Sequence, residues 1–382
     1  MDRTTLQNEA VNLGINNPYI VFELPTGAGK SLIAIRIIEE VGGEWNIVLA
    51  ETVHELNWIN EFKKHGKEYL LSKITFFCYQ SLHKYKNGKN YIYDEIHHMS
   101  SQKRLDLLED IHLNNVERFI GLSATLTRTQ KEAIEEVIGK FYLHKITLSQ
   151  VIDWGILPEP TVYFIGVTLS NTSKYLKYYY GKEKFVMCNE QEYYDRISAR
   201  IDTLKLKYFA SNSEFDRVRW LREANNRKKF LSNCKTRHAR EVLKYIKDKR
   251  FICFTGSIEQ SENLSNGKSI HSKLGKKKSE KLINDFNDGV IDKLFATGML
   301  REGVNLENIE AGLILQLDNT LRYFSQIHGR TLRSKFPEQY VLYVKNTQDE
   351  TYVKTALEDF NMDYVKFIEL KDLKICQNKK YM

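Results

Sequence analysis

The residues best suited to chemistry lie at positions 24–31, in the order Leu-Pro-Thr-Gly-Ala-Gly-Lys-Ser. A β-prone apolar run precedes this stretch at 19–22, and a helical pattern of apolar residues follows it from Leu32. A strand, a glycine-rich turn and Gly-Lys-Ser at the start of a helix are typical of a loop that binds nucleotide phosphates. The stretch therefore predicts a phosphate-binding loop, and the alternative is a chance glycine turn before a helix.

Each residue type in this loop suits phosphate binding for a physical reason. Gly27 and Gly29 permit a tight turn in which successive backbone amides face phosphate oxygens. The helix that begins there adds its positive N-terminal end. Lys30 would place a point charge on the β- and γ-phosphates, and the Ser31 hydroxyl would bind Mg²⁺. The predicted nucleotide contacts in the loop are Thr26, Gly27, Ala28, Gly29, Lys30 and Ser31.

Two adjacent acids, Asp94 and Glu95, follow an apolar run at 91–93. At a strand end beside a phosphate loop, one carboxylate can hold the water shell of Mg²⁺, and the next can orient and deprotonate the attacking water. We therefore predict Asp94 as a metal ligand, and Lys30, Asp94 and Glu95 as catalytic residues. A surface turn is the alternative. Ser123 and Thr125, after a later strand, could hydrogen-bond these carboxylates.

Arg330 and Arg333 lie within Gln-Ile-His-Gly-Arg-Thr-Leu-Arg at 326–333. Their spacing of three residues would place both guanidinium groups on one face of a helix. From there they could reach the γ-phosphate as arginine fingers, so both are predicted catalytic residues. The alternative is a solvated basic helix.

Gln7 lies upstream of the loop, in a helical pattern formed by Leu6, Ala10 and Val11. Its amide can both donate and accept hydrogen bonds, as recognition of an adenine edge requires. A surface glutamine explains the spacing equally well, so both interpretations stay open.

The composition is that of a globular chain. Its 382 residues suggest two to three domains, with 42% hydrophobic and 28% charged residues. No apolar run approaches the roughly 20 residues that span a membrane, and the polar N-terminus is unlike a secretory signal. The five cysteines are scattered, without metal-ligand spacing. These features predict a reducing cytoplasm and no membrane partner.

The positive charge is concentrated in the middle of the chain. Between Asn171 and Arg250 there are 21 Lys and Arg against 10 Asp and Glu, whereas the rest of the chain has 36 against 39. Aromatic residues are interleaved with these basic residues, and such a combination can follow phosphates and stack bases. We therefore predict nucleic-acid contacts at Lys205, Arg227 and Lys228. An ordinary helical subdomain with aromatic core positions is the alternative.

Apolar runs between the motifs predict further strands, at 46–50, 73–79, 118–122, 161–167, 250–254, 311–317 and 340–345. Helical patterns separate many of them, which favours parallel sheets in an α/β fold. The expected organisation is a first domain at 1–150, a crossing segment and basic helical insertion at 151–235, a second domain at 236–345 and a mixed-charge, helical tail at 346–382.

Several of these segments resemble, in order, motifs of the DExH type of superfamily 2 helicases and translocases. They are 24–31 as motif I, 51–58 as motif Ia, 94–97 as motif II, 123–125 as motif III, 293–305 as motif V and 326–333 as motif VI. The run at 121–128 is similar to the group that contains restriction-enzyme motor subunits and phage or repair translocases. Leu24 and Glu51 depart from the usual Ala and Pro, but neither touches the chemistry.

The resemblance implies two RecA-like parallel-sheet domains with a helical insertion between them, ATP in the cleft between the domains, and Mg²⁺. It implies an ATP hydrolase that acts as a helicase or translocase on nucleic acid, with DNA favoured, in replication, recombination or repair. The host it implies is a bacterial or phage-infected cell, with a phage origin as one option. Gly303 in the segment like motif V would contact the nucleotide. Thr52, Gln80, Thr255 and Thr297 would contact nucleic acid.

Three other functions stay open. The first is an RNA helicase, because the motifs are shared. The second is the ATPase motor subunit of a restriction or defence complex, whose nuclease would be another chain. The third is a nucleic-acid clamp that uses ATP as a switch, although Glu95, Arg330 and Arg333 argue for turnover.

Overall fold

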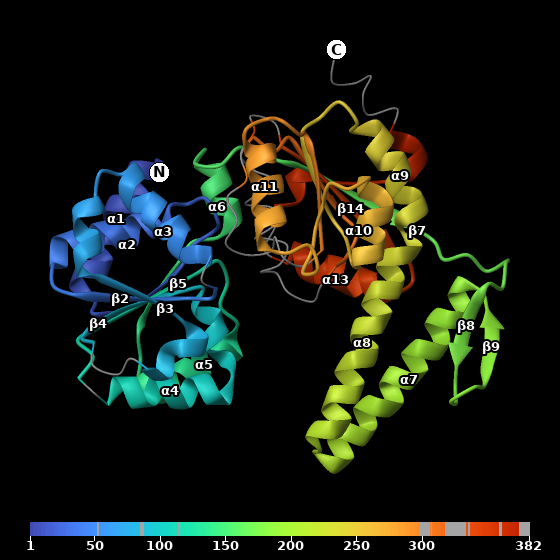
Figure 1. The fold of residues 1–382 in the computed structure, drawn as a ribbon, viewed down its shortest axis with the longest axis horizontal. Helices are drawn as coiled ribbons and strands as arrows, with labels where there is room; N and C mark the ends of the chain where they lie inside the picture. Colours follow the sequence, from blue (N-terminus) through green and yellow to red (C-terminus); the bar gives the residue numbers. More distant parts are fainter. Residues whose placement is uncertain are drawn as a thin grey trace. The chain divides into compact units, whose positions relative to one another are not determined.

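The computed structural model describes residues 1–51, 53–84, 88–113, 115–297, 306, 308–317, 334, 337–358 and 361–373. The chain divides into two compact units (Figure 1). The first consists mainly of residues 1–159, and the second contains most of the chain from Pro160 onward. Each unit is built around its own parallel β-sheet. Across the described ranges, every helix is too short or too polar to cross a membrane.

The sheet of the first unit has the strand order β3-β2-β4-β5-β1-β6, with parallel pairing of neighbours. Its strands are β1 (Tyr19–Glu23), β2 (Trp45–Leu49), β3 (Ile74–Cys78), β4 (Asn90–Asp94), β5 (Arg118–Ser123) and β6 (Tyr142–Lys145). Its helices are α1 (Arg3–Asn16), α2 (Lys30–Val41), α3 (Val53–Lys64), α4 (Gln102–His112), α5 (Arg128–Ile138) and α6 (Leu148–Asp153), with short 3₁₀ turns η1 (Glu68–Lys73), η2 (Tyr79–Lys84) and η3 (Ile96–Ser100). Because β5 lies between β4 and β1, the segments that follow these three strands meet at one edge of the sheet.

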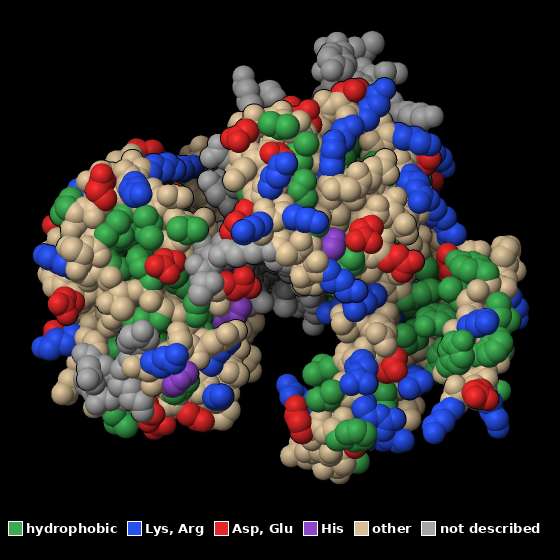
Figure 2. Space-filling view, in the orientation of Figure 1, with side chains coloured by type: hydrophobic (Ala, Val, Ile, Leu, Met, Phe, Trp, Pro, Cys, Tyr) green, Lys and Arg blue, Asp and Glu red, His purple; other side chains and the backbone are tan. Residues whose placement is uncertain are grey.

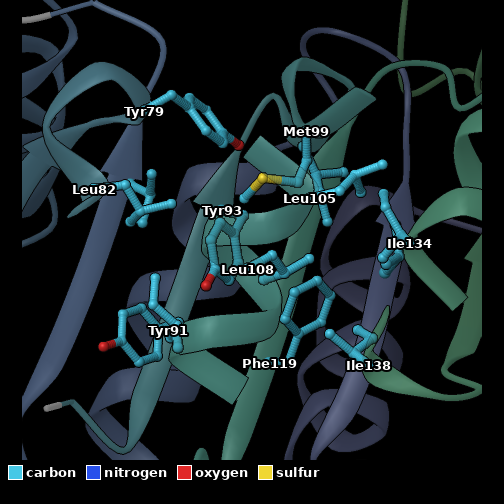
Figure 3. Close-up of a cluster of buried hydrophobic side chains, with 14 of the residues drawn as sticks. Tyr79, Leu82, Tyr91, Tyr93, Met99, Leu105, Leu108, Phe119, Ile134 and Ile138 are labelled. Atoms are coloured by element: carbon cyan, nitrogen blue, oxygen red, sulfur yellow. The ribbon is translucent and has the colours of Figure 1, made fainter. Parts of the chain in front are cut away.

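A buried hydrophobic cluster supports that edge (Figure 3). Tyr93 of β4 and Phe119 of β5 are each about 1% exposed, and their ring centroids lie 4.9 Å apart. Leu108 of α4 and Ile134 of α5 belong to the same cluster. Packing of this density allows a side chain few alternative positions, so it holds the end of β4, and the acids that follow it, in place.

The sheet of the second unit has the order β11-β12-β10-β13-β14-β7-β15, also with parallel pairing. Its strands are β7 (Thr161–Val167), β10 (Phe251–Phe254), β11 (Ser269–Ile270), β12 (Lys293–Ala296), β13 (Ala311–Ile314), β14 (Glu338–Val344) and β15 (Val365–Ile368). The described helices of this α/β part are α9 (Thr236–Tyr245), α10 (Ile258–Ser265), α11 (Lys276–Asn287) and α13 (Gln348–Leu357), with the 3₁₀ turns η4 (Met362–Tyr364) and η5 (Leu370–Asp372).

Two elements of this sheet come from segments outside the expected second domain. Strand β7 lies in the expected crossing segment, yet it pairs with β14 over its whole length. Strand β15 lies in the expected helical tail, where α13 is helical as expected. Phe164 of β7 is fully buried and stacks on Phe367 of β15, with ring centroids 5.4 Å apart. Burial of these apolar strands explains why both segments join the sheet.

The insertion consists of a two-stranded ribbon and a helical hairpin. The strands β8 (Leu176–Tyr179) and β9 (Phe185–Cys188) pair antiparallel, and α7 (Glu190–Ser211) packs against α8 (Glu214–Cys234). The expectation that the insertion within 151–235 is helical is therefore wrong for 176–179 and 185–188. Tyrosine, phenylalanine and valine favour strands, and Gly181 suits the turn between them.

Candidate functional site

The predicted phosphate loop connects β1 to α2, as the sequence analysis expects. Gly27 and Gly29 have φ of 91° and 98°, in the left-handed region where glycine is favoured. Gly29 is the N-cap of α2, which begins at Lys30. Lys30 Nζ donates a hydrogen bond to the carbonyl of Leu24 across 2.9 Å. The lysine side chain thus lies back along its own loop, beside the backbone amides of a helix N-terminus, which is where an anion binds.

Gln7 of α1 packs directly against this loop. Its Nε2 donates to the carbonyl of Ala28 across 3.3 Å, and the side chain is buried. A Cβ on Gly29 would lie 2.3 Å from the same Nε2, so a larger residue there would displace the Gln7 amide. Gln7 therefore supports the shape of the phosphate loop. This contact favours a positioning role, and the adenine contact stays a prediction.

Ser123, at the end of β5, connects the loop with the acidic segment. The amide of Leu24 donates to the carbonyl of Ser123 across 3.0 Å. The Ser123 hydroxyl donates to the carbonyl of Thr125 across 2.7 Å, so its oxygen accepts from Nδ1 of His97, 3.1 Å away. His97 therefore carries its proton on Nδ1 in this arrangement. The backbone carbonyl and the side-chain hydroxyl of Ser123 thus link the segments that resemble motifs I, II and III.

Glu95 has an unusual backbone conformation. Its φ and ψ are 50° and 56°, which is left-handed and costs a non-glycine residue on the order of 1 kcal/mol or more. Its Oε2 lies 3.3 Å from Nδ1 of His97, and the side chain is 17% exposed. Strain of this kind persists where surrounding structure holds it, and it is concentrated at functional sites. The predicted base is thus a partly exposed carboxylate on a constrained turn.

Two aromatic side chains hold Asp94, and the sequence analysis missed both. Nε1 of Trp58 on α3 donates to Oδ2 of Asp94 across 2.9 Å, and the Tyr79 hydroxyl donates to the Asp94 carbonyl across 3.0 Å. Both rings are buried. Burial raises the pKa of Tyr79 well above its usual range, so its hydroxyl remains a donor. The sequence shows Trp58 and Tyr79 as aromatic residues that follow two strands. It does not show that both hydrogen-bond to Asp94.

In the second unit, the structure brings two predicted nucleic-acid contacts together. Thr255 and Thr297 follow β10 and β12, which pair in parallel, and their Oγ1 atoms lie 2.6 Å apart. Thr297 Oγ1 also donates to the carbonyl of Ser257 across 3.1 Å. Thr255 is 1% exposed, whereas Thr297 is partly exposed. Thr255 therefore serves the local hydrogen-bond network, and Thr297 is the better placed of the two for an outside ligand.

The other predicted nucleic-acid contacts have different surroundings. Gln80 is exposed at the start of η2, and Lys205 is exposed on α7. Arg227 of α8, in contrast, donates to Ser198 Oγ across 3.2 Å and to Gln348 Oε1 across 3.0 Å. The Lys228 ammonium lies 5.5 Å from the ring centroid of Tyr352 in α13. Arg227 and Lys228 thus attach the helical hairpin to the α/β part, a role that spacing alone did not indicate.

Two family models match the chain. "Type III restriction enzyme, res subunit" matches residues 4–128, which contain the phosphate loop and the acids, and "Helicase conserved C-terminal domain" matches residues 228–335. The chain belongs to superfamily 2 of the helicases and translocases. As a superfamily 2 enzyme, it hydrolyses ATP.

Relatives of this superfamily 2 enzyme include archaeal proteins. It is 25% identical to DNA 3'-5' translocase XPB2 of Sulfurisphaera tokodaii, over 90% of this chain and 82% of that protein. It is 23% identical to Rad25 of Haloarcula marismortui, over 88% of this chain and 51% of that protein, so it spans about half the length of that relative. The structure is similar to S. cerevisiae Dbp5 bound to RNA and ADP BeF3, with a TM-score of 0.63, 12% identity and coverage of 98% of this chain and 91% of that chain. This likeness confirms the expected α/β fold with two RecA-like parallel-sheet parts.

Four predicted site residues of the superfamily 2 enzyme lie outside the described residues. They are Thr52, Gly303, Arg330 and Arg333. Their roles remain predictions from the sequence.

Proposed function

We propose that this superfamily 2 enzyme is a DNA translocase or helicase driven by ATP hydrolysis. The observation that carries the proposal is the Ser123 junction, which joins the phosphate loop to His97 beside Glu95. The relatives named for action on DNA support DNA as the substrate. The surplus of Lys and Arg between Asn171 and Arg250 supports a polyanionic partner as well.

In this proposal, residues 26–31 hold the phosphates of ATP. Lys30 would interact with the β- and γ-phosphates, and backbone amides at the start of α2 would face phosphate oxygens. Ser31 and Asp94 supply a hydroxyl and a carboxylate oxygen, the hard ligands that Mg²⁺ prefers, so this donor set fits the ion. Mg²⁺, when bound there, neutralises charge on the phosphate oxygens.

Glu95 is proposed to position the attacking water and accept its proton. The constrained backbone of Glu95 limits where its carboxylate can lie, and such restriction favours a reactive geometry. His97 donates from Nδ1 to the Ser123 hydroxyl and lies within 3.3 Å of Glu95. A movement at the end of β5 would therefore reach Glu95, the proposed base, through Ser123 and His97. Arg330 and Arg333 are proposed to stabilise the γ-phosphate in the transition state, and Gly303 to contact the nucleotide.

The nucleic-acid contacts are proposed at strand ends and on the insertion. The strand-end residues are Thr52, Gln80, Thr255 and Thr297. On the insertion, the exposed Lys205 is well placed for phosphates, while Arg227 and Lys228 would act mainly by holding α8. Contacts of lysine with phosphate would make binding salt-dependent and weak in sequence preference.

An ATPase assay with matched nucleic acids tests the substrate. Duplex DNA, single-stranded DNA and RNA of the same length and sequence would be titrated at fixed ATP, with Glu95→Gln as the control for contaminating ATPases. We expect DNA to raise turnover well above RNA. Equal or greater stimulation by RNA would replace the proposal with an RNA helicase, and single-turnover behaviour would indicate a clamp.

A second candidate is the motor subunit of a restriction complex. The match of residues 4–128 to the res-subunit family favours it. The tagged chain would then copurify with a nuclease, and the complex would cleave DNA only with hydrolysable ATP.

We also propose a cytoplasmic location, because the cysteines are scattered. The host that we propose is an archaeal cell rather than a bacterial or phage-infected one, because the relatives named above are archaeal.

A further inference from the structure

The ribbon of β8 and β9 has two unlike faces. Lys177 pairs with Met187, and Tyr179 pairs with Phe185, across the two strands. All four side chains are exposed, with Tyr179 at 51% and Phe185 at 42%. The alternate residues along both strands are half-buried or buried. Side chains of a strand alternate between faces, so the exposed four form one continuous outer face.

The opposite face fixes the ribbon on α7. Tyr178 packs edge-on against Tyr193 of α7, with ring centroids 5.7 Å apart. Just before β8, the exposed Tyr175 adds a second tie to α7, because its hydroxyl donates to Oε1 of Glu190 across 2.6 Å. Two aromatic anchors therefore set the orientation of the ribbon, and the outer face is held away from the helix. Single exposed apolar side chains are common on proteins, but neighbouring ones gathered on one face can mark a binding site.

The outer face combines aromatic rings with positive charge. The Lys177 ammonium lies 4.7 Å from the ring centroid of Phe185, and the Tyr179 and Phe185 rings lie 5.6 Å apart. Lys182 and Lys184, in and beside the turn, are also exposed. Figure 2 shows hydrophobic side chains with Lys and Arg beside them over this ribbon. Interfaces between proteins contain few lysines. Sites that bind unpaired nucleic acid combine positively charged residues with aromatic rings on which bases stack.

We propose that this outer face binds an unpaired stretch of nucleic acid, with bases stacked on Tyr179 and Phe185 and lysines near the phosphates. The proposal rests on the proposed function and adds the kind of strand that the insertion contacts. In a duplex the bases are already stacked inside, and their faces cannot reach an exposed ring. Unpaired bases present those faces, so the chemistry of this surface selects a single strand.

Two double variants separate stacking from general apolar contact. Tyr179→Leu with Phe185→Leu keeps apolar area but removes both rings, and Tyr179→Phe with Phe185→Tyr keeps the rings. Tyr142→Leu is the matched control, because Tyr142 is 46% exposed on strand β6 of the other unit. Binding would be measured by fluorescence anisotropy with an oligothymidylate of about 20 nucleotides, and with a blunt duplex.

We expect the leucine pair to weaken oligothymidylate binding by about tenfold or more, and the ring-retaining pair and Tyr142→Leu to bind within about twofold of wild type. Binding of the blunt duplex and the ATPase activity that this duplex stimulates should remain. Oligothymidylate binding unchanged in the leucine pair, with ATPase activity intact, would overturn this inference. A wild-type enzyme whose ATPase ignores all DNA would instead overturn the proposed function.

A photocrosslink tests the same point in the unaltered protein. An oligonucleotide that carries 5-iodouridine would be irradiated with the full chain, and crosslinked peptides would be identified by mass spectrometry. Crosslinks at Tyr179 or Phe185 that unlabelled oligothymidylate suppresses are expected. Crosslinks elsewhere but not on the ribbon would contradict the proposal, whatever the folding of the variants.

Discussion

Nε1 of Trp58 donates a hydrogen bond to Oδ2 of Asp94 across 2.9 Å, from α3 to the end of β4. Helix α3 begins within the segment 51–58, which the sequence analysis assigns to nucleic-acid contact through Thr52. The same helix thus holds the carboxylate that we propose as a metal ligand. Because the indole is 3% exposed, its position depends on packing of α3 rather than on solvent. This bond is a direct physical link between a predicted nucleic-acid element and the ATP site.

Trp58→Phe tests that link by removing the donor and keeping most of the ring. A hydrogen bond to a charged group contributes about 1.5–3 kcal/mol, so a misdirected Asp94 should lower kcat by roughly tenfold or more. The Mg²⁺ concentration for half-maximal activity should rise as well. Steady-state ATPase kinetics across a Mg²⁺ titration measure both effects.

Trp45→Phe is the control for loss of a buried indole bond. Nε1 of Trp45 donates to the carbonyl of Gly42 across 2.9 Å, and the ring is 1% exposed. This variant should lower the thermal unfolding temperature without changing the Mg²⁺ dependence. An equal change in Mg²⁺ dependence for both variants would reduce Trp58 to a structural residue.

Lys30→Ala and Glu95→Gln should separate ATP binding from turnover. Without Lys30 the phosphates lose a cationic partner, so nucleotide binding weakens and hydrolysis is lost. Glu95→Gln cannot accept the proton of water, so turnover should fall by about 10²–10⁴-fold while binding remains. A fluorescent ATP analogue and phosphate release measure the two steps. Wild-type turnover of Glu95→Gln would remove Glu95 as the base.

Arg333→Ala should lower turnover by about a thousandfold with a much smaller change in ATP affinity. A finger interacts most strongly when charge develops on the transferred phosphoryl oxygens. Arg333→Lys should rescue only in part, because a point charge does not replace the planar fork, and Arg330→Ala should behave like Arg333→Ala with more loss of binding. If the two arginines instead lie on a solvated helix, turnover of each alanine variant should change by only a few-fold, and lysine should restore it.

Local chemistry explains how much of this site the sequence could predict. A loop with Gly27, Gly29 and Lys30 works through neighbouring backbone atoms, so spacing alone indicates it. The bond from Trp58 to Asp94 joins two elements, and its partners are set by packing. Glu95 has left-handed backbone angles, which residues other than glycine rarely adopt. Residue propensities therefore do not predict this conformation. The ribbon at 176–188 is short, and short apolar runs suit helix and strand alike.

The insertion should divide into residues for binding and residues for stability. Lys205, Lys207 and Lys229 are exposed, so their joint replacement by alanine should weaken DNA binding at low salt and reduce the salt slope by up to about 2–3. The unfolding temperature of this triple variant should not change. Arg227→Ala removes bonds to Ser198 and Gln348, so it should lower the unfolding temperature by a few degrees. An unchanged salt slope in the triple variant would make the hairpin a scaffold.

Gln7→Ala distinguishes the two interpretations of Gln7. Its Nε2 donates to Ala28 within the phosphate loop, so the structure favours a role in loop shape, which serves any nucleoside triphosphate. A neutral hydrogen bond contributes about 1 kcal/mol, and kcat/KM for ATP and for GTP should both fall about fivefold. Asn8→Ala is the matched control, because Asn8 is the neighbouring exposed amide of α1. A loss confined to ATP would assign Gln7 to the adenine edge, since a positioning residue cannot discriminate between bases that it does not contact.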